Sequence, residues 1–218
     1  MQIHAIIVAG GMGSRMQADL PKQFMLLHNK PMLLHSIDVM QAVQAHIIVV
    51  VHPQFETYLQ DLLIEFNYKN IQIVQGGITR FDSVKNGVHA IQANATDVVL
   101  VHDAARPFIT KEMVEQIIAK VQNNNCVVPV TPIFDSLRMV ANGQSKIINR
   151  DTIKIIQTPQ AAMLSTLQQG FAQSYTEAFT DEASVCEAAG FEVSLVDGLQ
   201  QNIKITTAQQ LQMANAMG

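Results

Sequence analysis

Residues 3–15 read IHAIIVAGGMGSR, an apolar run that leads directly into a glycine-rich loop. The run at 3–9 is rich in Ile and Val and shows no alternation of polar and apolar residues, which is typical of a strand buried on both faces of a parallel sheet. Short runs of the same kind recur along the chain, at residues 47–51, 71–74, 98–101 and 126–130. We therefore expect these five segments to form strands of one sheet.

Amphipathic stretches separate these runs. Apolar residues lie three or four positions apart, as on one face of a helix, in residues 33–43, 55–66, 81–91 and 113–121. Thr110 is the expected N-cap of the last of these helices. The same rhythm resumes at residues 163–173, 181–189, 191–196 and 207–217. The alternation predicts an α/β fold, a three-layer sandwich with a mostly parallel, Rossmann-like sheet that gathers ligands at the carboxyl ends of its strands.

The segment between residues 131 and 157 breaks this rhythm. Residues 136–141 and 146–149 flank the pair Asn142-Gly143, which favours the tight turn of a β-hairpin. We predict a hairpin arm that protrudes from the fold at about 131–157, and an arm of this kind needs a partner surface. Because no linker rich in Pro, Gly or Ser interrupts the chain, we expect residues 1–218 to form a single domain that carries this arm.

The composition of the 218 residues excludes several classes of protein. Hydrophobic residues make up 48% and charged residues 15%, which provides enough apolar surface for a core and rules out bulk disorder. The net charge of −4 argues against nucleic acid or an anionic membrane as a partner. No apolar run reaches the ~18 residues of a membrane span, and two cysteines are too few for a disulfide framework. We therefore expect a cytoplasmic protein that binds neither nucleic acid nor membrane.

The loop after the first strand is suited to phosphate binding. Glycines let backbone N–H groups approach a phosphate closely, and this loop holds three of them, Gly10, Gly11 and Gly13. Arg15 and Lys22 follow and supply the bidentate and point-like cations that suit a polyphosphate. Met16 stands where a dinucleotide-binding fingerprint needs a small residue, which disfavours a Rossmann oxidoreductase, and no P-loop sequence is present. A surface loop with solvated Arg15 and Lys22 is the alternative.

Four more segments join the glycine loop and the Pro-Lys-Gln-Phe of residues 21–24. In order, they are residues 76–84, 101–108, 158–160 with 181–184, and 202–206. The whole set resembles the sugar-phosphate nucleotidyltransferases and, more narrowly, the 2-C-methyl-D-erythritol 4-phosphate cytidylyltransferase family of the non-mevalonate isoprenoid pathway. The resemblance implies transfer of the cytidylyl group of CTP to that sugar-alcohol phosphate with release of pyrophosphate, a Mg²⁺ cofactor, and a homodimer formed through the arm.

The resemblance also implies roles for individual residues. The catalytic cations, which hold the triphosphate and stabilise the transition state, are implied to be Arg15, Lys22 and Lys204. The nucleotide is implied to bind at Ala9, Gly10, Gly11, Gly13, Gly77, Ser83, Asp103 and Ala104. Asp103 is further implied to contact the acceptor and Mg²⁺. On the arm, the residues implied to bind the acceptor in the neighbouring subunit's site are Ser136 and Arg150.

Several of these residues also have structural interpretations, which stay open at this point. Asp103 can occupy a turn and pair with Arg106, and Ser83 can bond to its own helix backbone. Lys204 can be an exposed lysine on a short edge strand. We expect His102 to be structural.

The chain departs from the family pattern at two positions. Ile78 and Gln201 stand where members often carry an acidic residue, which weakens the assignment of the turn after Gly77 and of any acidic ligand before Asn202. The role of Asn202 beside the metal is left open. Asp181-Glu182 is expected to begin a capped helix and is assigned no catalytic role.

Two other functions remain open. Ribitol 5-phosphate cytidylyltransferases share the fold and the nucleotide loop, but they tend to have Ser-Val where this chain has Ala104-Ala105. They also lack the Glu-Ala-Ser of residues 182–184. A nucleotide-binding module without catalysis should have lost its charged site residues, yet this chain keeps Arg15, Lys22, Asp103 and Lys204.

Overall fold

The computed structural model describes residues 1–11, 20–122 and 125–216, and in this part of the chain an eight-stranded sheet forms the centre of the fold. The strand order is β10-β7-β11-β6-β1-β4-β5, and β12 pairs with β7. The strands of this sheet are β1 (Ile3–Ala9), β4 (His46–Val51), β5 (Ile71–Gln75), β6 (Val98–Asp103), β7 (Asn125–Pro132), β10 (Lys154–Ile156), β11 (Gln160–Met163) and β12 (Glu192–Asp197).

Most neighbouring strands of the sheet are parallel. β6, β1, β4 and β5 pair in parallel, and so do β7 and β12, which confirms the predicted mostly parallel α/β sheet. β11 lies antiparallel between β6 and β7, and β10 is antiparallel to β7. Strand β11 could not be predicted from its residues, QAAM, because they include no β-branched or aromatic side chain and only the two neighbouring strands impose the extended pairing.

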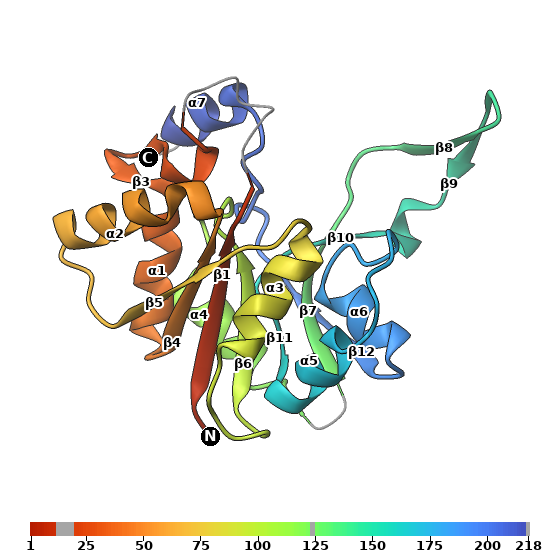
Figure 1. Ribbon diagram of the computed structural model, residues 1–218. Coiled ribbons are helices and arrows are strands. Elements are labelled where there is room, and N and C mark those ends of the chain that lie inside the picture. Colours follow the sequence, from red (N-terminus) through yellow and green to blue (C-terminus); the bar gives the residue numbers. More distant parts are fainter. Residues whose placement is uncertain (12–19, 123–124, 217–218) are drawn as a thin grey trace.

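Helices cover both faces of the sheet and complete the predicted three layers (Figure 1). Ala5 and Ile7 of β1 pack into one core, whereas Ile6 between them packs into the core on the opposite face. This burial on both faces explains why β1 is continuously apolar. The first core includes helices α1 (Met32–Ala42), α2 (Glu56–Glu65) and α4 (Lys111–Ile118), and the second includes α3 (Arg80–His89), α5 (Leu164–Phe171) and α6 (Glu182–Ala188).

Smaller elements flank the sheet. The terminal helix α7 (Ala208–Ala216) packs in a separate apolar cluster that contains Leu27 of β2. The remaining short elements are β2 (Leu26–Leu27), β3 (Lys30–Pro31) and the 3-10 helices η2 (Lys22–Phe24), η3 (Pro53–Phe55) and η4 (Arg150–Thr152). The Thr110 hydroxyl accepts from the backbone N–H of Met113 at 3.3 Å, which confirms the predicted N-cap. In the described residues, none of the helices combines the length and apolar character needed to cross a membrane.

The predicted hairpin is present and consists of β8 (Leu137–Ala141) and β9 (Gln144–Ile148). Its turn residues Asn142 and Gly143 have φ values of 50° and 73°, as a tight hairpin turn that matches strand twist requires. Figure 1 shows the hairpin standing away from the layered part of the fold. Its apolar side chains Val140 and Ile147 are largely exposed.

The short strand expected around Lys204 is absent, so that prediction is wrong. Residues 202–206 carry no strand assignment, and Ile205 is tied to the fold by a hydrogen bond from its N–H to the carbonyl of Ala105 at 2.9 Å. The apolar pattern at 203–205 instead reflects burial of Ile205 in the cluster beneath α7.

Candidate functional site

A pocket of about 360 Å³ opens where β1, β5 and β6 end, which is the edge of the sheet where ligands were expected. It gathers most of the predicted site residues that the structure describes: Ala9, Gly10, Gly11, Lys22, Gly77, Ser83, Asp103, Ala104 and Lys204. Gly13 and Arg15 lie outside the described residues.

The turn after β5 forms one wall of this pocket and has no room for a larger residue. A Cβ atom on Gly77 would lie 2.3 Å from the Cβ of Asp82. The Ser83 hydroxyl accepts from the N–H of Gly77 at 3.1 Å and donates to the carbonyl of Thr79 at 2.9 Å. Ser83 therefore bonds to its own helix, as its structural interpretation expects, while it also lines the pocket.

Gln23 supports the segment of the pocket at residues 9–11, a role that the sequence does not predict. Its side chain is buried and donates to the carbonyls of Ala9 and Gly11, at 2.7 and 3.0 Å. A single amide thus holds both ends of the first glycine pair. The sequence pointed to Gln23 only through its place in the Pro-Lys-Gln-Phe segment. The hydrogen-bond partners of an amide in a loop cannot be predicted from the sequence.

Lys22 and Lys204 reach the pocket from opposite ends of the sequence. Lys22 begins the 3-10 helix η2, and its Nζ donates to the carbonyl of Ile205 at 3.0 Å. Lys204 directly precedes Ile205, so the two amino groups belong to segments that touch. The structure therefore places two of the predicted cations together at the pocket.

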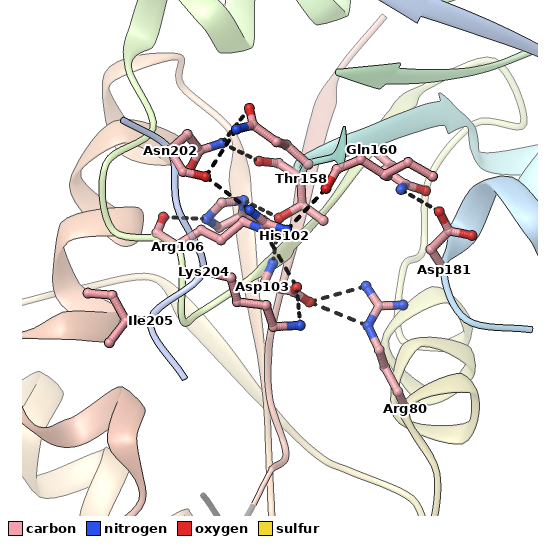
Figure 2. Close-up of polar contacts among 12 residues, drawn as sticks. Arg80, His102, Asp103, Arg106, Thr158, Gln160, Asp181, Asn202, Lys204 and Ile205 are labelled. Carbon is pink, nitrogen blue, oxygen red and sulfur yellow. Dashed lines mark hydrogen bonds and ion pairs between the residues drawn. The ribbon is translucent and has the colours of Figure 1, made fainter. Parts of the chain in front are cut away.

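Asp103, the last residue of β6, lies at the centre of a group of cations (Figure 2). Its Oδ2 is 2.8 Å from Nζ of Lys204, and its Oδ1 is 3.3 Å from Nη2 of Arg80. The contact with Arg106 expected from a simple turn is longer, at 3.9 Å. Burial alone would raise the pKa of Asp103, but Arg80 and Lys204 outweigh it and hold that pKa well below its usual range. Asp103 is therefore an anion that side-chain cations hold in place.

Arg80 also contacts a second carboxylate, that of Glu182, which the sequence predicts only as part of a helix start. Glu182, in the first turn of α6, is completely buried, and its two oxygens accept from Nη1 and Nη2 of Arg80 at 2.6 and 3.1 Å. Burial raises the pKa of Glu182, and the Arg80 charge opposes that rise. The expected capped helix start is present, with Asp181 as the N-cap in a capping box with Ser184.

His102 holds the backbone around Asp103. The Thr158 hydroxyl accepts from the N–H of Asp103 at 3.1 Å and lies 3.0 Å from Nδ1 of His102. The carbonyl of Arg106, 3.1 Å from Nε2 of His102, can only accept, so the proton of the neutral ring is on Nε2, and Nδ1 accepts from the Thr158 hydroxyl. Burial lowers the pKa of His102 to about 4, so the ring is neutral near pH 7. These contacts agree with the structural role expected for it.

Asn202 belongs to the same supporting network rather than to the pocket lining. It is fully buried, and its side-chain amide donates to the carbonyl of Thr158 at 2.9 Å. Its own carbonyl accepts from Nη1 of Arg106 at 2.9 Å. The polar segment around 202 therefore fixes the path of the chain that leads to Lys204.

Known proteins match this chain over nearly its whole length. The family model for 2-C-methyl-D-erythritol 4-phosphate cytidylyltransferase matches residues 3–217. The chain belongs to this family. The enzyme of that name from Phocaeicola vulgatus is 39% identical over 220 residues and covers 100% of both chains, and that from Bacteroides thetaiotaomicron is 38% identical with the same coverage.

Solved structures agree with the assignment to the cytidylyltransferase family. The 2-C-methyl-D-erythritol 4-phosphate cytidylyltransferase from Thermus thermophilus is 27% identical and covers 100% of this chain and 98% of its own, with a TM-score of 0.79. The 4-diphosphocytidyl-2C-methyl-D-erythritol synthase from Anaerococcus prevotii is 28% identical and covers 99% and 97%, with a TM-score of 0.83. The family resemblance identified from the five sequence segments is thus confirmed.

The chemistry of the cytidylyltransferase pocket fits a cation that substrate phosphates would largely hold. In the described part of the chain there is no group of three or more His, Cys, Asp and Glu side chains that could bind a metal. One carboxylate, Asp103, lines the pocket and is ionised. Mg²⁺ is commonly bound through one or two carboxylates together with substrate phosphates. A site with one carboxylate satisfies that requirement only when a nucleotide is present.

The predicted arm residues lie together but away from this pocket. Ser136 and Arg150 line a separate hollow at the base of the hairpin, where Arg150 donates to the carbonyl of Phe134. Ser136 and Arg150 do not line the pocket that contains Lys22 and Asp103 in the described part of the same chain. Their predicted contact with the acceptor therefore requires a second subunit.

Proposed function

We propose that this cytidylyltransferase joins CTP and 2-C-methyl-D-erythritol 4-phosphate to form 4-CDP-2-C-methyl-D-erythritol and pyrophosphate. Membership of the family supports this reaction. The observation that carries it in the structure is the pocket in which Lys22, Lys204 and Asp103 meet the glycine turns. Cations beside backbone N–H groups at a sheet edge suit a nucleoside triphosphate.

The transfer needs positioning and charge neutralisation rather than a general base. The acceptor phosphate already carries an anionic oxygen, which forms a new bond to the α-phosphorus of CTP while the bond to the β-phosphate oxygen breaks. Lys22 and Lys204 neutralise charge that develops on the phosphates, and Arg15 is proposed to join them. The second substrate becomes reactive once it is held in line with the α-phosphorus.

The substrates are proposed to occupy two adjoining hollows. The base and ribose lie against Gly77 and Ser83, and the triphosphate lies along Gly10 and Gly11. A second hollow of about 210 Å³ adjoins the first through Arg80, Asp103 and Lys204, is also lined by Thr158 and Asp181, and is proposed to hold the polyol. Asp103 is therefore proposed to contact the acceptor. It is also proposed to bind Mg²⁺, which when present supplies additional positive charge to the phosphates.

We further propose a cytoplasmic homodimer of single-domain subunits, in which the arm carries Ser136 and Arg150 to the partner's site. The exposed Val140 and Ile147 of the hairpin support a protein contact there. Sedimentation equilibrium should give twice the 24.0 kDa mass of one chain. A monomer at micromolar concentration would contradict this assembly.

Pyrophosphate release from CTP tests the reaction. We expect release with 2-C-methyl-D-erythritol 4-phosphate, and much slower release with ribitol 5-phosphate or with ATP, GTP or UTP in place of CTP. Faster release with ribitol 5-phosphate would replace the proposed acceptor. Binding of CTP without release of pyrophosphate, whichever acceptor is supplied, would instead indicate a binding module.

A further inference from the structure

The buried acid Glu182 touches neither hollow of the site. In the described part of the chain, both hollows are lined by Arg80, but Glu182 lines neither. Its side chain has no solvent exposure, and both of its oxygens accept from the Arg80 guanidinium. Glu182 is therefore connected to the site by its hydrogen bonds to Arg80.

Arg80 forms a bridge between two carboxylates. The edge made by Nη1 and Nη2 faces Glu182, while Nε and Nη2 donate to Oδ1 of Asp103 at 3.4 and 3.3 Å. A planar guanidinium can hold two carboxylates in a fixed relative orientation, which a lysine cannot do. The remaining oxygen of Asp103, Oδ2, faces Lys204.

Stability does not explain this arrangement. Arg80 lies in the first turn of α3, where the helix dipole disfavours a cation. Glu182 is buried beside the apolar cluster of α6, and a buried ion pair contributes little to stability compared with apolar side chains of similar volume. The bridge costs desolvation of three charged groups, Arg80 and its two carboxylates, and what it provides is a defined geometry at Asp103.

We propose that Glu182 is a positioning residue for cytidylyl transfer, which acts by fixing Arg80 so that Arg80 holds Oδ1 of Asp103 and leaves Oδ2 directed at Lys204. Without the Glu182 charge, Arg80 is neutralised by Asp103 alone and draws that carboxylate away from Lys204. Asp103 and Lys204 then lose their relative positions although both side chains remain. The inference rests on the proposed function, since its readout is cytidylyl transfer.

The variant Glu182→Gln tests this role because it keeps the shape and removes the charge. We expect kcat for pyrophosphate release to fall about 100-fold, the scale of a small misplacement of reacting groups, with the KM for CTP changed less than about threefold. The matched control is Asp97→Asn, which alters another buried carboxylate at the opposite end of β6. We expect this control to lower Tm and keep the wild-type kcat.

A second variant keeps the proposal testable if removing the Glu182 charge prevents folding. Replacing both partners, Arg80→Met with Glu182→Leu, leaves no unpaired charge and is expected to fold with a similarly reduced kcat. A wild-type kcat in either variant would overturn the positioning role, as would a Glu182→Gln loss confined to Tm. If the wild-type protein itself releases no pyrophosphate, the proposed function fails. If the wild type is active and the variant is equally active, only the positioning role of Glu182 fails.

Discussion

Two buried carboxylates mark the limits of strand β6, Asp97 directly before its first residue and Asp103 as its last, and the two are held in different ways. At the amino end, Asp97 accepts from the backbone N–H groups of Gln2 and Asn94 at 2.7 and 3.0 Å. At the carboxyl end, Asp103 is held mainly by the side chains of Arg80 and Lys204. Both aspartates are nearly inaccessible to solvent.

The difference separates a structural end of the sheet from a reactive one. A backbone donor cannot leave its acceptor without local unfolding, so Asp97 has a permanent set of partners. A lysine on a flexible stem can turn from a carboxylate to an incoming phosphate and leave the backbone in place. The charge of Asp103 is thus held by side chains that can change partners, whereas that of Asp97 is held by the backbone.

The largest expected effect comes from removing a cation at the reactive end. Lys22→Ala should lower kcat/KM for pyrophosphate release about 1,000-fold, because one charge-stabilising donor to the transition state is lost. Its Tm should change little, since Lys22 is partly exposed. The control Lys111→Ala removes an exposed lysine that pairs with Glu115 and should be as active as the wild type. Turnover near normal in Lys22→Ala would remove this lysine from the mechanism.

A smaller effect should follow from closing the nucleotide turn. Gly77→Ala places a methyl group 2.3 Å from the Cβ of Asp82, so the turn must move and the KM for CTP should rise about 10- to 100-fold. Gly87→Ala in α3, the helix that follows this turn, is the matched control, because its methyl group would meet Ile6 at 2.8 Å inside the core. It should lower Tm and leave the KM unchanged. Equal KM values for the two variants would place the nucleotide elsewhere.

Much of the fold, and the edge of the sheet at which the site lies, could be predicted from the sequence. The apolar runs predict the parallel strands, and because their carboxyl ends share one edge, the segments at Gly10, Gly77 and Asp103 were expected to meet. The family resemblance added Lys204, which lies too far along the chain for any local pattern to connect it with that edge.

The rest depends on contacts that exist only after folding. The bridge from Glu182 through Arg80 to Asp103 joins three elements, and an acid in a helical first turn reads in sequence as a favourable end charge. Gln23 is similar, since only the folded loop shows which carbonyls it reaches. The prediction of a strand around Lys204 is wrong because half-buried Ile203 and buried Ile205 alternate with Lys204 in the same pattern as the residues of an edge strand.

The smallest expected effect tests a feature that both ends of β6 share, a buried histidine beside each aspartate. Burial lowers the pKa of His102 to about 4 and also lowers the pKa of His4, which lies 3.9 Å from Asp97. At a pH below the ordinary histidine pKa of about 6.5, these two histidines are protonated in the unfolded chain but stay neutral in the folded one. The free energy of unfolding should therefore fall as the pH decreases from about 6.5 towards 4, and His102 alone should account for a loss of about 2 kcal/mol at pH 5.

Urea unfolding between pH 7 and pH 4.5 measures this loss, and His102→Gln should flatten much of the slope. Gln at this position can still donate to the carbonyl of Arg106, so the comparison isolates the proton from the hydrogen bond. His89→Gln, which changes an exposed histidine, should keep the wild-type slope. If His102→Gln keeps that slope too, the proton uptake on unfolding belongs to other groups, and the neutral His102 ring is not what limits stability in acid. A residual slope that disappears only when His4 is also replaced would divide the acid sensitivity between the two ends of the strand.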